Sequence, residues 1–239
     1  MKKLKIMTHV VVGYPSLEDT IRLVTTMEKA GVDMVELQIP FSDPLADGPT
    51  IMKACEASLA RGTKVVDAFV VMEKLAKEVA IPLLFMAYYN TVFNYGVEKF
   101  CRDAKKAGCK GLIVPDVPIE EEENEHFIEM CKKHDLFNIR VVSPSSTDER
   151  LKKNAAVGTG FVYCTARQGI TGVRDSLPAD VTDYLKRVRK HFTIPLAVGF
   201  GISKREHIEA LRDHADIAVI GSALIDEKNV SEFLERMIH

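Results

Sequence analysis

The stretch that decides the fold is Ala30-Gly31-Val32-Asp33-Met34-Val35-Glu36-Leu37-Gln38. It follows the segment Leu17–Ala30, where apolar residues recur every three or four positions, as they do in a helix with one buried face. Gly31 stands where such a helix ends, because glycine readily adopts the left-handed conformation that closes a helix. The apolar run Met34–Gln38 then predicts a short buried strand. One helix therefore leads through a glycine into one strand.

The same order of helix, glycine and strand recurs along the chain, and Ala107-Gly108-Cys109-Lys110 repeats it closely. Nearly continuous apolar strands between amphipathic helices are typical of a parallel sheet whose outer face is covered. Eight such strands in 239 residues favour a closed barrel over an open doubly wound sheet, although the pattern alone fits both. The predicted strands are Ile6–Val12, Met34–Gln38, Pro82–Met86, Gly111–Val114, Asn138–Val142, Phe161–Cys164, Leu196–Val198 and Ile217–Ile220.

Amphipathic segments separate these strands, and Ser16 and Thr147 stand where helix N-caps belong. No linker or low-complexity tract interrupts the alternation. We therefore predict one α/β domain over residues 1–239, a (β/α)₈ TIM barrel. The predicted helices are Leu17–Ala30, Val65–Glu78, Val97–Ala107, Glu122–Lys133, Thr147–Lys153, Val181–His191, Lys204–Asp213 and Val230–Ile238.

The composition argues against several classes of partner. The net charge is −2 with acidic and basic residues mixed along the chain, so nucleic acid is not expected as a partner. The N-terminal lysines precede an apolar run that breaks at Gly13-Tyr14-Pro15, and no stretch is apolar enough to span a bilayer. The five cysteines show no CxxC spacing, which argues against disulfides and zinc and fits a reducing cytoplasm. We expect a cytoplasmic protein that contacts no membrane.

In a barrel of this kind the chemistry lies at the carboxyl ends of the strands. Glu36 lies inside the second predicted strand between apolar residues, where a carboxyl group is rarely found without a partner or a purpose. It is either a proton-transfer group or an inward glutamate paired with a cationic side chain, and the pattern does not separate the two. Asp43 and Asp47 follow in a proline-rich loop, where aspartates also serve as ordinary turn formers.

The loops after the last three strands are candidates for phosphate binding. Gly199-Phe200-Gly201 follows the seventh strand and Gly221-Ser222 follows the eighth, and glycines at these places let backbone N–H groups approach an anion. Ordinary strand-to-helix turns explain the same glycines. The loop after the sixth strand, Ala166–Gly172, is long enough to close over a site as a lid.

The loop after the second predicted strand reads Pro40-Phe41-Ser42-Asp43-Pro44-Leu45-Ala46-Asp47-Gly48-Pro49-Thr50. Together with Tyr88–Phe93, Val114–Pro118, Gly169–Gly172, Gly199–Ser203 and Gly221–Ala223, it resembles the tryptophan synthase α subunit family over almost the whole chain. The Pro40–Thr50 motif is the most specific part of this resemblance. The glycine motifs alone recur in many phosphate-binding barrels. The resemblance implies a lyase of tryptophan biosynthesis that cleaves indole-3-glycerol phosphate into indole and glyceraldehyde 3-phosphate.

The resemblance also implies roles for individual residues. Glu36 falls on the family's general acid/base and Asp47 on its second catalytic carboxylate. No metal or organic cofactor is implied in this chain, and a pyridoxal-phosphate (PLP) enzyme, the β subunit, is the implied partner in an α2β2 assembly. The remaining matches are the phosphate cradle (Gly172, Phe200, Gly201, Gly221 and Ser222), the indole pocket and lid (His9, Met86, Tyr88, Tyr163, Thr171 and Arg167) and the partner interface (Asp43, Pro44, Asn90 and Pro118).

Three residues depart from the family pattern. Gln38 stands where glycine is usual, His9 where an apolar residue touches the indole ring, and Tyr14 where aspartate is usual. We expect Gln38 to lie beneath the loop that carries Asp47, within reach of Ser42 or Asp43. These departures leave open a weakly active subunit whose role is to activate a β partner. Another phosphate-sugar isomerase or aldolase is the third alternative, but it leaves the Pro40–Pro49 motif unexplained.

Overall fold

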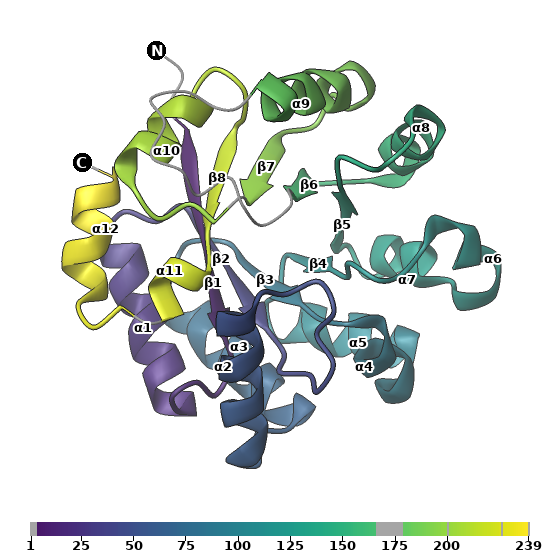
Figure 1. Cartoon of the computed structure of the whole chain (residues 1–239). Coiled ribbons are helices and arrows are strands. Elements are labelled where there is room, and N and C mark those ends of the chain that lie inside the picture. Colours follow the sequence, from purple (N-terminus) through teal and green to yellow (C-terminus); the bar gives the residue numbers. More distant parts are fainter. Residues whose placement is uncertain (1–3, 166–178, 200, 226, 239) are drawn as a thin grey trace.

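The computed structural model describes residues 4–165, 179–199, 201–225 and 227–238. Its strands form a closed parallel barrel in the order β1 to β8, and β1 pairs with both β2 and β8. Helices surround this barrel, as Figure 1 shows. The strands are β1 Lys5–Val11, β2 Met34–Gln38, β3 Leu83–Met86, β4 Gly111–Ile113, β5 Phe137–Val142, β6 Val162–Thr165, β7 Leu196–Gly199 and β8 Ile217–Ile220.

The predicted barrel and its eight strands are confirmed, with boundaries that shift by a residue or so. Ser16 caps α1 by accepting the N–H of Asp19, and Thr147 caps α8 by accepting that of Arg150. The helices are α1 Leu17–Lys29, α2 Pro49–Ala60, α3 Val65–Glu78, α4 Tyr89–Tyr95, α5 Val97–Lys106, the 3₁₀ turn η1 Ile119–Glu121, α6 Glu122–Glu125, α7 Phe127–Lys133, α8 Asp148–Val157, α9 Ala179–His191, α10 Arg205–Leu211, α11 Ser222–Ile225 and α12 Val230–Ile238.

The prediction of one helix over Glu122–Lys133 is wrong. The chain breaks at His126, whose φ of 54° lies in the left-handed region, and two short helices result. The carboxylate of Glu122 accepts the N–H groups of Ile128 and Glu129, so it satisfies donors that the first turn of α7 would otherwise leave unpaired. Two further helices of seven residues or more, α2 and α4, were not predicted.

Apolar side chains pack in two separate layers. Alternate strand residues such as Met7, Leu84 and Ile217 point inward and fill the barrel. Their neighbours along the strands, such as Leu37 and Phe85, join the layer between the strands and the helices. The five cysteines are all buried free thiols. Within the described ranges, every helix is too short or too polar to cross a lipid bilayer.

The turn after β1 packs tightly against the helix that follows the β2 loop. Gly13 has a φ of 80°, and a Cβ there would lie 2.4 Å from Oγ1 of Thr63 and 2.6 Å from Oγ of Ser58. Ser58 belongs to α2 and donates its hydroxyl to the carbonyl of Val12. The absence of a side chain at Gly13 therefore lets the end of β1 meet α2, which begins two residues after Asp47.

We expect Gly13→Ala to lower the free energy of unfolding by about 3 kcal/mol, from left-handed backbone strain and the displaced Ser58 hydrogen bond. The matched control is Gly62→Ala, where φ is 87° but an added Cβ would have nothing within 4 Å of it. It should cost about 1 kcal/mol, because only the backbone strain remains. Urea unfolding measures both. Equal losses in the two variants would contradict the tight packing at Gly13.

Candidate active site

A cavity of about 500 Å³ opens at the carboxyl ends of the strands. Its volume lies in the range of small-molecule sites, and every strand of the barrel or the loop after it contributes to its wall. Thr50 and Ile51 of α2 also line it. The sequence-predicted site residues that line it are His9, Glu36, Asp47, Met86, Tyr163, Gly201, Gly221 and Ser222.

Glu36 is buried, and one of its two carboxyl oxygens is held by neighbours. The parallel register of β1 and β2 pairs His9 with Glu36, and Nδ1 of His9 lies 2.8 Å from Oε1 of Glu36. The hydroxyl of Tyr163, on β6 across the barrel, donates to the same oxygen at 3.3 Å. Oε2 of Glu36 has no hydrogen-bond partner among the described residues. Glu36 thus has a histidine partner at one oxygen, and none of the described residues binds its other oxygen.

Asp47 is held by two side chains, one at the end of β2 and one at the N-cap of α4, just after β3. Nε2 of Gln38 donates to Oδ2 of Asp47 at 2.7 Å, and the hydroxyl of Tyr88 donates to the same oxygen at 2.9 Å. The Tyr88 hydroxyl also accepts the backbone N–H of Ala46 at 2.9 Å. The loop after β2 is therefore tied to the barrel at the residue that carries the second carboxylate.

These carboxylates change the acidity of the groups around them. Burial alone would lower the pKa of His9, but the hydrogen bond to Glu36 and the charges of Glu36 and Asp47 outweigh it and raise that pKa. Burial, and then the charge of Glu36, raises the pKa of Tyr163 well above its ordinary value. Burial and the charge of Asp47 do the same to the pKa of Tyr88. Both phenols therefore remain protonated donors to the carboxylates.

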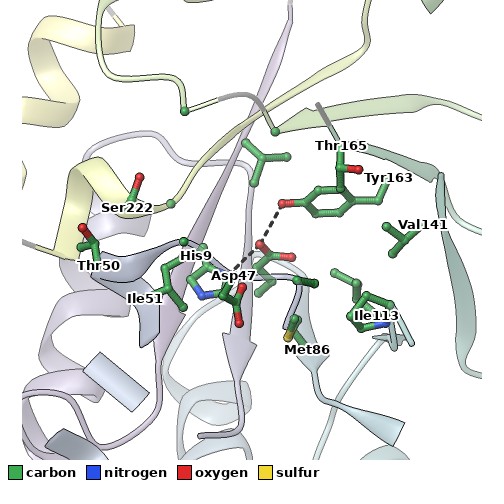
Figure 2. Close-up of a pocket in the computed structure, with 18 of the residues that line it drawn as sticks. His9, Asp47, Thr50, Ile51, Met86, Ile113, Val141, Tyr163, Thr165 and Ser222 are labelled. Carbon is green, nitrogen blue, oxygen red and sulfur yellow. Dashed lines mark hydrogen bonds and ion pairs between the residues drawn. The ribbon is translucent and has the colours of Figure 1, made fainter. Parts of the chain in front are cut away.

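The two ends of the cavity differ in character. Figure 2 shows Ser222 and Thr50 at one end, Met86, Ile113 and Val141 at the other, and His9 and Asp47 between them. No lysine or arginine lines the cavity in the part of the chain that the structure describes. The arrangement suits an elongated ligand with an apolar ring at one end and an anionic group held by neutral donors at the other.

A family model described as tryptophan synthase alpha chain matches residues 1–236. This chain belongs to the tryptophan synthase alpha chain family. Relatives of that name include one from Desulfotalea psychrophila, 48% identical over 95% of this chain and 89% of its own length. Another, from Syntrophotalea carbinolica, is 44% identical over 94% of this chain and 88% of its own length.

Solved structures of the family agree with the barrel. A tryptophan synthase structure from Mycobacterium tuberculosis superposes with a TM-score of 0.91 at 31% identity, covering 99% of this chain and 91% of that one. A variant tryptophan synthase α subunit from Pyrococcus furiosus gives 0.89 at 30% identity and covers 99% of both chains. The family assignment makes this chain a carbon–carbon lyase of tryptophan biosynthesis.

The remaining predicted residues of this family member lie elsewhere. Tyr88 is almost fully buried and does not line the cavity, since its hydroxyl reaches Asp47 from behind. Asp43 and Asn90 are exposed, Pro118 is half-buried and Pro44 is buried, all outside the cavity wall. Arg167, Thr171, Gly172 and Phe200 lie outside the described residues.

Sequence reasoning missed some contributors to the candidate site. Thr50 and Ile51 line the cavity from the first turn of α2, a helix whose start was signalled by Pro49, because proline is favoured at the first helical position. Gln38 was expected near Ser42 or Asp43, but it binds Asp47 itself, and Ser42 donates to Asp43 instead. The sequence pattern does not indicate how far the loop after β2 folds back over the barrel.

Removing the Tyr88 hydroxyl should loosen Asp47 without disturbing the barrel. We expect Tyr88→Phe to lower kcat/KM about tenfold, or 1.4 kcal/mol, because it removes one bond to Asp47 and one to Ala46. The matched control is Tyr95→Phe, which also removes a 2.9 Å bond from a tyrosine hydroxyl to an aspartate, Asp103, away from the cavity. If both variants retain the parent's kcat/KM, Tyr88 does not position Asp47.

Proposed function

We propose that this chain cleaves indole-3-glycerol phosphate by a retro-aldol reaction, with Glu36 moving the protons and Asp47 stabilising the charged indole ring. The observation that carries the proposal is the placement of the two carboxylates. Both face one cavity between an apolar end and a glycine–serine end, and the hydrogen bonds from described residues hold only one oxygen of each carboxylate. Two carboxylates in different surroundings can divide acid/base and electrostatic work.

The reaction requires two proton transfers at neighbouring atoms. Indole C3 gains a proton, the C3–C3′ bond breaks, and the C3′ hydroxyl loses its proton as it becomes the aldehyde oxygen. Oε2 of Glu36 is the oxygen without a partner among the described residues, so it is the atom we assign to both transfers. The proton that leaves the hydroxyl restores the one given to C3, and the carboxyl group ends the cycle as it began.

Asp47 has a different task. Protonation at C3 places positive charge on the indole nitrogen, and a carboxylate that accepts the ring N–H offsets this charge. Gln38 and Tyr88 both donate to Oδ2, which leaves Oδ1 for the ring nitrogen. Because the ring itself accepts the proton and stores the electrons, we propose that the cleavage uses no metal or organic cofactor held by this chain.

The phosphate end of the substrate is assigned to Gly201, Gly221 and Ser222. Gly201 has a φ of 70°, and Gly221 would place a Cβ in ordinary contact with His9 and Ile51, toward the cavity. Backbone N–H groups without neighbouring side chains let a phosphate oxygen approach closely. The apolar end formed by Met86, Ile113 and Val141 then receives the indole ring.

The partner we propose is a tryptophan synthase β subunit, a PLP enzyme that consumes the indole, in an α2β2 assembly. The loop after β2 and helix α4 expose large apolar side chains, with Leu45 94% and Phe93 57% accessible. The predicted interface residues Asp43 and Asn90 lie exposed on the same two segments. An apolar patch with a polar rim is typical of a protein interface.

Activity assays of Glu36→Gln test the proposed function. The parent should release indole from indole-3-glycerol phosphate, measured alone and with a β subunit added. Glu36→Gln should fold normally and lose about a thousandfold in kcat, because an amide cannot carry the transferred proton. Glu73→Gln, on the surface of α3, is the control and should match the parent. The proposal is wrong if the parent releases no indole under either condition, or if Glu36→Gln stays within about tenfold of it.

Gly221→Val tests the phosphate end. The side chain would point into the cavity from a position where its Cβ makes only ordinary contacts, 3.5 Å from Cβ of His9 and 3.8 Å from Cδ1 of Ile51. The fold should survive, whereas KM should rise at least about tenfold and inhibition by inorganic phosphate should weaken in parallel. Gly221→Ala should show a smaller effect of the same kind. Unchanged phosphate inhibition in both variants would place the phosphate elsewhere.

A further inference from the structure

Two polar side chains at the mouth of the barrel each hold one of the proposed catalytic carboxylates. His9 on β1 binds Glu36, and Gln38 at the end of β2 binds Asp47. Both are buried, His9 at 4% and Gln38 at 0% exposure, and the strand register places them one inward position apart. Nε2 of His9 and Oε1 of Gln38 are buried without a hydrogen-bond partner among the described residues.

The side chain of His9 makes a hydrogen bond to Glu36 that an apolar side chain at this position could not make. An apolar ring would line the cavity equally well, but it would leave both oxygens of Glu36 without a fixed donor from β1. The His9 imidazole instead occupies Oε1 at 2.8 Å, together with the Tyr163 hydroxyl at 3.3 Å. A carboxyl group that is hydrogen-bonded at one oxygen cannot rotate freely, so its other oxygen keeps a fixed orientation.

We infer that His9 is a positioning residue for the lyase reaction, which holds Oε1 of Glu36 through its Nδ1–H so that Oε2 alone exchanges protons with the substrate. This inference rests on the proposed function, because it assigns a task to Glu36 in that reaction. His9 itself touches no reacting atom in this scheme. It acts through Glu36, whose position it fixes and whose ionised form it stabilises.

The proton balance needs no additional reactant. Glu36 begins with a proton on Oε2 and accepts the Nδ1–H of His9 at Oε1. Transfer from Oε2 to indole C3 forms the C3–H bond and leaves a carboxylate, which the His9 N–H stabilises while the C3–C3′ bond breaks. The proton released by the C3′ hydroxyl returns to Oε2. The proton on Nδ1 stays in place throughout, so His9 is unchanged at the end.

The groups that face His9 set the expected pH dependence. Glu36 approaches from β2 and Asp47 from the loop after it, while Tyr163 on β6 shares Oε1. The cavity residues of α2 and of the β8 end, Ile51 and Gly221, carry no charge. Burial lowers the pKa of His9, whereas its hydrogen bond to Glu36 and the negative charge of Glu36 raise it. The pKa of His9 is therefore raised overall only because Glu36 is beside it.

Titration of the His9 ring by NMR in the full-length protein tests the pair without any substrate. In the parent, the pKa of the His9 ring should lie above the ordinary histidine value of 6.5. In Glu36→Gln it should be lower than in the parent, because burial still lowers the pKa and the charge of Glu36 no longer raises it. Glu73→Gln, on the surface of α3, is the matched control and should leave the titration of His9 as it is in the parent. Equal titration of His9 in the parent and in Glu36→Gln would overturn the inference, whether or not the chain cleaves the substrate.

Kinetics of two His9 variants test the positioning role. His9→Phe should lower kcat about tenfold or more and change KM by less than about threefold. His9→Asn, whose amide N–H can replace Nδ1–H, should recover most of kcat. If His9→Phe retains the parent's kcat, or if His9→Asn is no better than His9→Phe, His9 only fills space and the inference is wrong.

Discussion

The structure of the site depends on the parallel pairing of β1 with β2. This pairing sets His9 beside Glu36 and places Gln38 at the next inward-facing position of β2, nearer the mouth of the barrel. A carboxyl group inside a barrel is costly unless it is paired or hydrogen-bonded, so Glu36 can stay buried only because His9 and Tyr163 bind it. The loop after β2 then places Asp47 over the same cavity. One register therefore positions both carboxylates.

Much of the fold followed from the sequence because its signals are local. Helix caps such as Ser16, glycine turns and apolar strands are read within a few residues, and the closed barrel followed from their number. The helix predicted through His126 was wrong because Glu122 reaches forward to cap α7, a contact that periodicity does not encode. Helix α2 was not predicted because the prolines and aspartates of the loop before it favour turns, although Pro49 marks the start of the helix.

The candidate site was less accessible to sequence reasoning, because its key contacts join distant residues. The sequence indicated Glu36 and Asp47, and left open whether Glu36 was functional or paired with a cation. The structure pairs Glu36 with His9 and still leaves Oε2 without a partner among the described residues, so the two interpretations are compatible. Gln38 was expected to act on the loop, but only the three-dimensional path of the loop shows that its amide meets Asp47. Such a bond reduces the ordering that the loop must undergo when substrate binds.

The most direct test of this account is a crystal structure with indole propanol phosphate, a substrate analogue without the hydroxyl groups needed for cleavage. The account predicts the indole ring against Met86 and Ile113 with its N–H on Oδ1 of Asp47, its C3 facing Oε2 of Glu36, and the phosphate beside Gly221 and Ser222. A ring bound in the reverse direction, or a phosphate away from Gly221 and Ser222, would contradict it.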